Sequence, residues 1–311
     1  MIAKKIGLLG GRGYVGQEIL KLLNEHPSIS VTSVYSSSHA GESIEGYAKD
    51  NLVYSSIDLN DLKLSDEDAY ILALPNNEAQ QYVEIISEHN PDATLLDLSS
   101  DFRFTDLWQY RIPELSGPVS SSKISNPGCY ATAMQLMLAP LVSELHGHVN
   151  LFGISGFSGA GASPNARNNQ DALADNVLAY SLVDHLHEQE VKQHMYDKIL
   201  FTPHVGNFFR GIHITCNMIL KNSMSREEAK IIFETFYADK PLIKIQSEAS
   251  NLQQARETSF VFIGGFEVDE SIKRLTFCCS IDNLLKGAAT QAVQNLNSAF
   301  GWEDNVGIIE S

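Results

Sequence analysis

Cysteine is scarce in this chain, with four among 311 residues, and the scarcity argues against a fold built on disulfide bonds. No two cysteines have the two-residue spacing of a thiol redox motif or a zinc motif. Cys278 and Cys279 are adjacent, so in a strand they point to opposite faces of the sheet. We therefore expect free thiols and a reducing compartment; the other two cysteines are Cys129 and Cys216.

Long apolar runs and an excess of positive charge are also missing. No stretch approaches the ~20 apolar residues of a membrane-spanning helix, and Ile6–Leu9 is too short for a signal peptide. A net charge of -16 disfavours a nucleic-acid partner. We expect no nucleic-acid or membrane partner and a cytoplasmic location, or an organellar matrix if a transit peptide has been removed.

A glycine-rich turn near the start of the chain indicates dinucleotide binding. An apolar strand over Lys4–Leu9 leads into the turn, and a helical pattern over Gln17–Glu25 follows it. Glycines let the backbone turn tightly and approach a pyrophosphate at the helix N-terminus. The alternative is an ordinary glycine turn. The candidate cofactor-binding residues are Gly10, Gly11, Arg12, Gly13, Tyr14, Val15 and Gly16.

The end of the second strand favours NADP(H) over NAD(H). The strand Val31–Tyr35 is followed by three serines and His39, without the carboxylate that often binds the ribose 2′-hydroxyl of NAD. Ser36 and Ser38 are therefore candidate donors to a 2′-phosphate. The alternative is a solvated serine-rich loop.

The order of predicted elements indicates two kinds of domain. Strands and helices alternate through residues 1–128, which predicts an α/β, doubly wound parallel sheet of the Rossmann type. Beyond residue 129, strands follow one another with few crossovers, which predicts an α+β domain on a mixed sheet. A last, long helix is expected over Asn283–Phe300.

Cys129 is the first candidate for chemistry. It follows Pro127-Gly128 and precedes a run of helix-forming residues, which places its thiol at a helix N-terminus. The free N–H groups and the dipole at that position stabilise a thiolate, which is a nucleophile. The alternative is a buried cysteine that acts as a small hydrophobic residue.

Two histidines are candidate proton partners for that thiol. His185 and His187 are separated by one residue, and histidine titrates near neutral pH. In an extended segment their side chains would point in opposite directions, so only one would face Cys129. The alternative of metal ligation lacks a third ligand at suitable spacing, so no metal is predicted.

Taken together, the motifs resemble one family, N-acetyl-gamma-glutamyl-phosphate reductase of arginine biosynthesis. The resemblance covers nearly the whole chain in the expected order. The matching segments, besides the glycine turn, are Asp101-Phe102-Arg103, Asn126-Pro127-Gly128-Cys129-Tyr130, Gly156-Phe157-Ser158-Gly159-Ala160-Gly161, His185-x-His187, Pro203-His204-Val205, Phe208-Phe209-Arg210-Gly211-Ile212 and Asp282-Asn283-Leu284-Leu285-Lys286-Gly287-Ala288-Ala289.

The resemblance implies a fold shared with aspartate-semialdehyde dehydrogenase, NADP(H) as cofactor, an acyl phosphate as substrate, and a homodimer or homotetramer. Cys129 would be the nucleophile, and His187 or His185 the acid/base. Residues 1–128 and 283–311 would form the NADP-binding domain, and residues 129–282 the catalytic α+β domain. The further candidates are Ser158, Gly159 and Asn283 for the cofactor and Arg103, Asn126 and Arg210 for the phosphate.

The chemistry is consistent with that implication. A thiolate displaces phosphate from an acyl phosphate, the thioester accepts hydride, and histidine protonates the resulting oxyanion. The same chemistry on N-acetyl-aminoadipyl phosphate or aspartyl phosphate stays open, because a pocket distinguishes one methylene by only ~1–3 kcal/mol. A Cys-His hydrolase or acyltransferase and a non-catalytic NADPH-sensing protein are alternatives of other classes.

Overall fold

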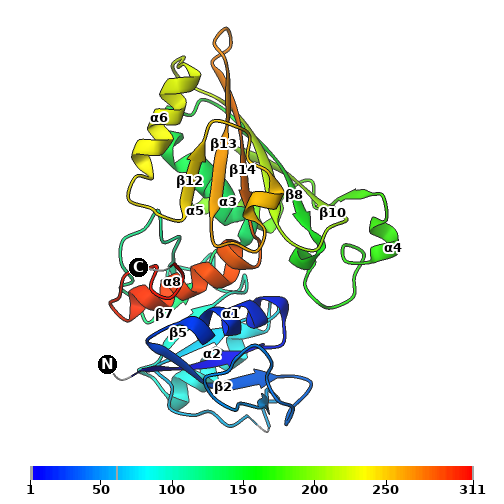
Figure 1. Cartoon of the computed structure of the whole chain (residues 1–311), viewed down its shortest axis with the longest axis vertical. Coiled ribbons are helices and arrows are strands. Elements are labelled where there is room, and N and C mark those ends of the chain that lie inside the picture. Colours follow the sequence, from blue (N-terminus) through cyan, green and yellow to red (C-terminus); the bar gives the residue numbers. More distant parts are fainter. Residues whose placement is uncertain (1–2, 61, 310–311) are drawn as a thin grey trace. The chain divides into compact units, whose positions relative to one another are not determined.

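The computed structural model describes residues 3–60 and 62–309 of the chain. The chain forms two compact units (Figure 1). Unit 1 comprises residues 1–127 and 288–311, and unit 2 comprises residues 128–287. Residues 1, 2, 61, 310 and 311, which the sequence assigns to the nucleotide-binding domain, lie outside the described part.

Unit 1 is built on a parallel sheet. Among the described residues its order is β3-β2-β1-β4-β5-β7-β6, and every neighbouring pair is parallel. The direction of winding reverses between β1 and β4, the position at which such sheets bind ligands beyond the strand carboxyl ends. The strands are β1 (Lys4–Leu9), β2 (Ile29–Ser36), β3 (Tyr54–Ser56), β4 (Ala69–Leu72), β5 (Thr94–Asp97), β6 (Gln109–Tyr110) and β7 (Lys123–Ser125).

Helices cover both faces of this sheet. Buried side chains of α1 (Tyr14–Glu25) and α8 (Thr290–Ala299) share one apolar core with β1 and β2. Buried side chains of α2 (Ala79–His89) belong to a second core with Tyr70 of β4. Apolar residues recur at helical spacing in α1, so its buried stripe faces the sheet. The doubly wound parallel sheet predicted from the sequence is confirmed.

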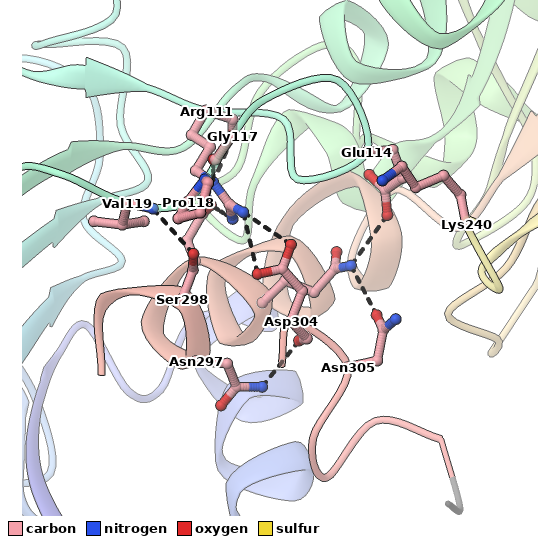
Figure 2. A network of polar contacts seen from close by, with 12 residues as sticks. Arg111, Glu114, Gly117, Pro118, Val119, Lys240, Asn297, Ser298, Asp304 and Asn305 are labelled. Carbon is pink, nitrogen blue, oxygen red and sulfur yellow. Dashed lines mark hydrogen bonds and ion pairs between the residues drawn. The ribbon is translucent and has the colours of Figure 1, made fainter. Parts of the chain in front are cut away.

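A buried arginine fixes the C-terminal segment of unit 1 (Figure 2). Arg111 Nη2 pairs with Asp304 at 2.8 Å, Nη1 donates to Asn295 Oδ1 at 2.9 Å, and Nε donates to the Gly117 carbonyl at 2.9 Å. The Arg111 side chain is only 2% exposed. A buried guanidinium needs this many partners, because its desolvation is otherwise uncompensated.

Unit 2 is built on a mixed sheet, as predicted. Among the described residues its order is β12-β13-β14-β11-β8-β10-β9; β8 and β10 pair in parallel, as do β12 and β13, and the other pairs are antiparallel. The strands are β8 (Val149–Gly156), β9 (Val177–Ala179), β10 (Ile199–Gly206), β11 (Ile212–Ile219), β12 (Ile243–Gln246), β13 (Val261–Asp269) and β14 (Arg274–Ile281). The helices are α3 (Cys129–Leu138), α4 (Gln170–Leu173), α5 (Leu186–His194), α6 (Arg226–Phe236) and α7 (Leu252–Ala255).

The two faces of the mixed sheet differ. Along β11, buried residues alternate with half-buried ones, and helices α3, α5 and α6 contact the sheet. The opposite face carries Phe152, which is 42% exposed, and Leu200, which is 47% exposed. Cys279 is buried and Cys278 half-buried, as expected for neighbours on opposite faces of a strand. In the described part of the chain, no helix combines the length and the apolar character needed to cross a membrane.

The last predicted helix differs from the prediction at its start. In place of one α-helix over Asn283–Phe300, a π-helical turn over Leu285–Ala289 precedes α8. The Gly287 N–H donates to the Asp282 carbonyl at 2.9 Å, a bond that spans five residues. Hydrophobic periodicity does not distinguish this wider turn from an α-helix.

Candidate active site

The glycine turn of unit 1 joins β1 to α1. Gly10 has φ 82°, and a Cβ there would lie 2.2 Å from the Ala73 carbonyl oxygen; at Gly16 it would lie 2.4 Å from that of Gly10. The fold itself therefore requires these two glycines. At Gly13, the N-cap of α1, a Cβ would meet only the Gly10 oxygen at 3.4 Å. No side chain caps α1, so its first N–H groups point into the open space beside Gly13. That arrangement is the one that binds a pyrophosphate at a helix N-terminus.

Arg12 lies beside the serines that follow β2. Its Nη1 donates to Ser38 Oγ at 2.9 Å, and Ser36 Oγ donates to the Ser38 carbonyl at 2.5 Å. The sequence assigned Arg12 only to the glycine turn. The structure adds its charge to the serine loop, where a 2′-phosphate would need a cation.

Cys129 is the first residue of α3, as its sequence context predicted. Gly128 is the N-cap, and as a glycine it offers no side chain to accept the first N–H groups of the helix. The Gly128 N–H donates instead to Glu190 Oε2 at 3.0 Å. Cys129 is half-buried, whereas Cys216 and Cys279 are fully buried, and burial raises the pKa of both of those thiols far above the ordinary value. Cys129 therefore differs from them in both access and position.

The two histidines do not lie in an extended segment, so the expectation that they point in opposite directions is wrong. Helix α5 begins between them, and their rings lie 5.0 Å apart. His185 is the N-cap, and its Nδ1 accepts the His187 N–H at 3.1 Å. Burial, then the neighbouring His187, lowers the pKa of His185 to about 3. His187 Nε2 lies 3.8 Å from Glu190 Oε1, so a carboxylate faces its imidazole.

Two tyrosines complete this part of unit 2, and neither had a role assigned from the sequence, although Tyr130 ends the Asn126–Tyr130 motif. The Tyr130 ring lies 6.1 Å from that of His187, and the Tyr180 ring lies 5.5 Å from that of His185. Burial, then the nearby Cys129, raises the pKa of Tyr180 to about 12. The guanidinium carbon of Arg167 lies 4.8 Å from the Tyr180 ring. Tyr180 precedes His185 by five residues, and that proximity was the one signal available in the sequence.

The candidate phosphate ligands are all buried and engaged by protein groups. In unit 1, Arg103 Nε donates to the Asn126 carbonyl at 3.0 Å, and Asn126 Oδ1 accepts from Asn295 at 3.0 Å. In unit 2, Arg210 forms a two-point ion pair with Asp282 at 2.7 and 3.0 Å. The charge of Arg210 is therefore already compensated by a carboxylate.

Three further cofactor candidates lie in unit 2. Asn283 Nδ2 donates to Ser158 Oγ at 3.0 Å, and its Oδ1 accepts the Gly211 N–H at 2.6 Å. Gly159 follows Ser158 in the 3₁₀ turn Phe157–Ala160. The structure thus brings Ser158 and Asn283 together. Among residues 3–60 and 62–309, no group of three or more His, Cys, Asp or Glu side chains is placed to hold a metal ion.

A parallel nucleotide-binding sheet, and a mixed-sheet unit with a thiol at a helix start, define a two-domain dehydrogenase fold. The chain belongs to the semialdehyde dehydrogenase family. Residues 5–122 match the family's description "Semialdehyde dehydrogenase, NAD binding domain". Residues 129–283 match "Semialdehyde dehydrogenase, dimerisation domain".

Relatives confirm the resemblance inferred from the sequence. The N-acetyl-gamma-glutamyl-phosphate reductase of Xanthomonas campestris pv. campestris (strain B100) is 43% identical over 305 residues, covering 96% of this chain and 96% of that protein. "Protein arg-6, mitochondrial" of Neurospora crassa is 41% identical over 315 residues, covering 98% of this chain. The chain spans 36% of the length of that fungal protein.

Solved structures share the fold. Aspartate semialdehyde dehydrogenase II from Vibrio cholerae superposes with a TM-score of 0.80 at 17% identity, covering 96% of this chain and 99% of that one. Aspartate semialdehyde dehydrogenase with NADP from Candida albicans gives a TM-score of 0.75 at 15% identity, covering 98% of this chain and 99% of that one. The predicted pairing of a Rossmann-type domain with a mixed-sheet domain is confirmed.

Proposed function

We propose that the chain reduces N-acetyl-gamma-glutamyl phosphate to N-acetylglutamate 5-semialdehyde and phosphate, with NADPH as reductant. The observation that carries the proposal is the placement of Cys129 at the start of α3, in the unit that also holds the His187–Glu190 pair. Relatives over 40% identical across nearly the whole chain are named for this reaction.

The residues of unit 2 account for the covalent steps. The Cys129 thiolate attacks the acyl carbon, the bond to phosphate breaks, and a thioester forms. NADPH, when bound, supplies the hydride that reduces this thioester. His187 donates its proton to the resulting oxyanion, with Glu190 stabilising the imidazolium beforehand. The neutral His187 imidazole then takes that proton back as the carbonyl re-forms and the carbon–sulfur bond breaks, which releases the aldehyde and returns the thiolate to the start of α3.

The anionic groups of the substrate need cations in a chain with net charge -16. Arg103 is one candidate, because its buried guanidinium lies beside Asn126, the other phosphate candidate of unit 1. Arg167 is a second candidate, since it is half-buried and packs on Tyr180 within unit 2. The pairing with Asp282 makes Arg210 a poorer phosphate ligand than the sequence suggested.

Turnover in the reverse direction tests this function. Purified protein is given NADP, phosphate and a panel of semialdehydes, and NADPH formation is followed by absorbance. We expect phosphate-dependent reduction of NADP, fastest with N-acetylglutamate semialdehyde. Faster turnover of the N-acetyl-aminoadipate or aspartate semialdehyde would contradict the substrate assignment and favour the corresponding acyl phosphate. Hydrolysis or acyl transfer without NADP reduction would favour the hydrolase, and NADPH binding without any turnover would favour the sensor.

For the cofactor, we predict higher kcat/KM with NADPH than with NADH. Replacing Arg12 by Gln should lower kcat/KM for NADPH about tenfold, because a charged contact of about 1.4 kcal/mol is lost, and should leave that for NADH unchanged. Arg226→Gln, which removes an exposed positive charge from unit 2, is the matched control. Equal efficiency of the wild-type protein with both cofactors would contradict the assignment of Arg12, Ser36 and Ser38.

For the partner, we propose a homodimer formed through the face of the unit 2 sheet that carries Phe152 and Leu200. The match to a dimerisation domain and the exposed Phe152 and Leu200 support a second copy as the occupant. Phe152→Asp with Leu200→Asp should halve the mass measured by light scattering. Ile231→Asp, at an equally exposed position on α6, should leave it unchanged. A tetramer that splits into dimers in the double variant would place a second interface elsewhere; an unaltered mass would exclude this face.

For the location, we propose the cytoplasm or an organellar matrix. The fungal relative carries "mitochondrial" in its name. Fluorescence of the tagged full-length gene product in its own cells tests the proposal, and a signal at the cell surface would contradict it.

A further inference from the structure

Gly287, in the π-helical turn Leu285–Ala289, packs against the nucleophile within unit 2. A Cβ at Gly287 would lie 2.7 Å from Cys129 Cβ and 3.2 Å from Cys129 Cα. Real Cβ atoms do not approach other atoms so closely, so any side chain here displaces Cys129 or the turn. The backbone of Gly287 is not in the left-handed region, so close approach accounts for the glycine: Cys129 is the nearest neighbour, and the Asp282 carbonyl oxygen would lie 3.2 Å from the added Cβ.

Asp282 anchors this turn. Its Oδ1 accepts the N–H groups of Leu284 at 2.9 Å and Leu285 at 3.1 Å, and its carbonyl accepts the Gly287 N–H at 2.9 Å. Its side chain is 0% exposed and pairs with Arg210 at 2.7 Å. A buried carboxylate with a bidentate guanidinium partner has a restricted conformation, so the turn whose N–H groups it accepts is held in one position.

We propose that Gly287, on the turn anchored by Asp282 and Arg210, is a positioning residue that sets where the Cys129 thiol lies at the start of α3. The position matters because the first-turn N–H groups stabilise a thiolate only over a short distance. The inference rests on the proposed thiol chemistry of Cys129. It also gives Arg210 a task other than phosphate binding.

Gly287→Ala tests the proposal through the thiol itself. The rate of Cys129 alkylation by iodoacetamide is followed against pH by peptide mass spectrometry, without substrate. We expect the midpoint to rise by about one pH unit, since a displaced thiolate loses N–H stabilisation. We also expect kcat to fall roughly 10- to 100-fold, with NADPH affinity unchanged. Gly117→Ala is the control, because a Cβ there meets nothing within 4 Å.

Arg210→Lys separates positioning from phosphate binding. Lysine keeps the charge but loses the two-point contact with Asp282. Positioning predicts a shifted alkylation midpoint, as in Gly287→Ala, with the KM for phosphate near wild type. A raised KM for phosphate with an unshifted midpoint would instead make Arg210 a phosphate ligand.

Two results would overturn the proposal. One is an alkylation profile of Gly287→Ala that matches wild type, even if the melting temperature falls, because Gly287 would then be structural only. The other is a shifted midpoint in Gly117→Ala as well. Because alkylation is measured without substrate, failure of the proposed reaction with the semialdehyde panel leaves this test intact.

Discussion

Replacement of Cys129 by serine is expected to lower kcat by at least about 10³-fold, equivalent to about 4 kcal/mol of activation free energy. A serine hydroxyl is far less ionised than a thiol near neutral pH, and an ester accepts hydride less readily than a thioester. The position at the start of α3 favours an anion on sulfur but cannot ionise an alcohol. NADPH binding should persist, because the glycine turn belongs to unit 1.

Steady-state kinetics and NADPH titration by calorimetry measure these two effects. The matched control is Cys278→Ser, a half-buried cysteine on β14 in the same unit, which should keep kcat within about twofold. Mass spectrometry after mixing enzyme, acyl phosphate and no cofactor should find the acyl group on Cys129 alone. Substantial reductase activity in Cys129→Ser would remove the thioester mechanism.

Replacement of His187 by asparagine is expected to slow the chemical step about 10²- to 10³-fold, within the usual range for loss of a general acid. His187 faces the Glu190 carboxylate, which favours its protonated form. His185 has a pKa lowered to about 3, so it stays neutral near pH 7 and cannot supply the proton. His185→Asn should have the smaller effect, since asparagine is a good N-cap and replaces the acceptor for the His187 N–H.

Single-turnover rates distinguish the two variants, and circular dichroism against pH supplies a control. Because the pKa of His185 is lower in the folded protein than in the unfolded chain, the unfolded chain takes up the proton first as pH falls below about 6.5. The free energy of unfolding should therefore decrease as the pH is lowered below about 6.5 in the wild type, and should decrease less steeply in His185→Asn. If His185→Asn removes hydride transfer while His187→Asn retains it, the two roles must be exchanged.

Much of the fold could be predicted because local pattern determines it. The alternation of strands and helices over residues 1–128 specifies a parallel sheet, since parallel strands need helical crossovers. The position of Cys129 at a helix start could be predicted, because Pro127-Gly128 interrupts the preceding strand and the residues after Cys129 favour a helix. These features depend on neighbours in sequence, so they could be read before any contact was known.

The functional groups that depend on distant partners could not be predicted in this way. The sequence predicted Arg210 to be a phosphate ligand, because its carboxylate partner Asp282 lies 72 residues further along the chain and could not be inferred. Arg12 reached the serine loop across 26 residues. The relative orientation of His185 and His187 differs from the predicted one, because a helix starts between them.

The sequence by itself therefore determined the two kinds of sheet, the glycine turn and the thiol at a helix start. Tertiary structure alone decided which charges are compensated, which histidine faces a carboxylate, and that Gly287 lies against Cys129. The physical reason is that backbone propensity and hydrophobic period act over a few residues. Burial, ion pairing and close backbone approach are set by packing between segments far apart in the chain.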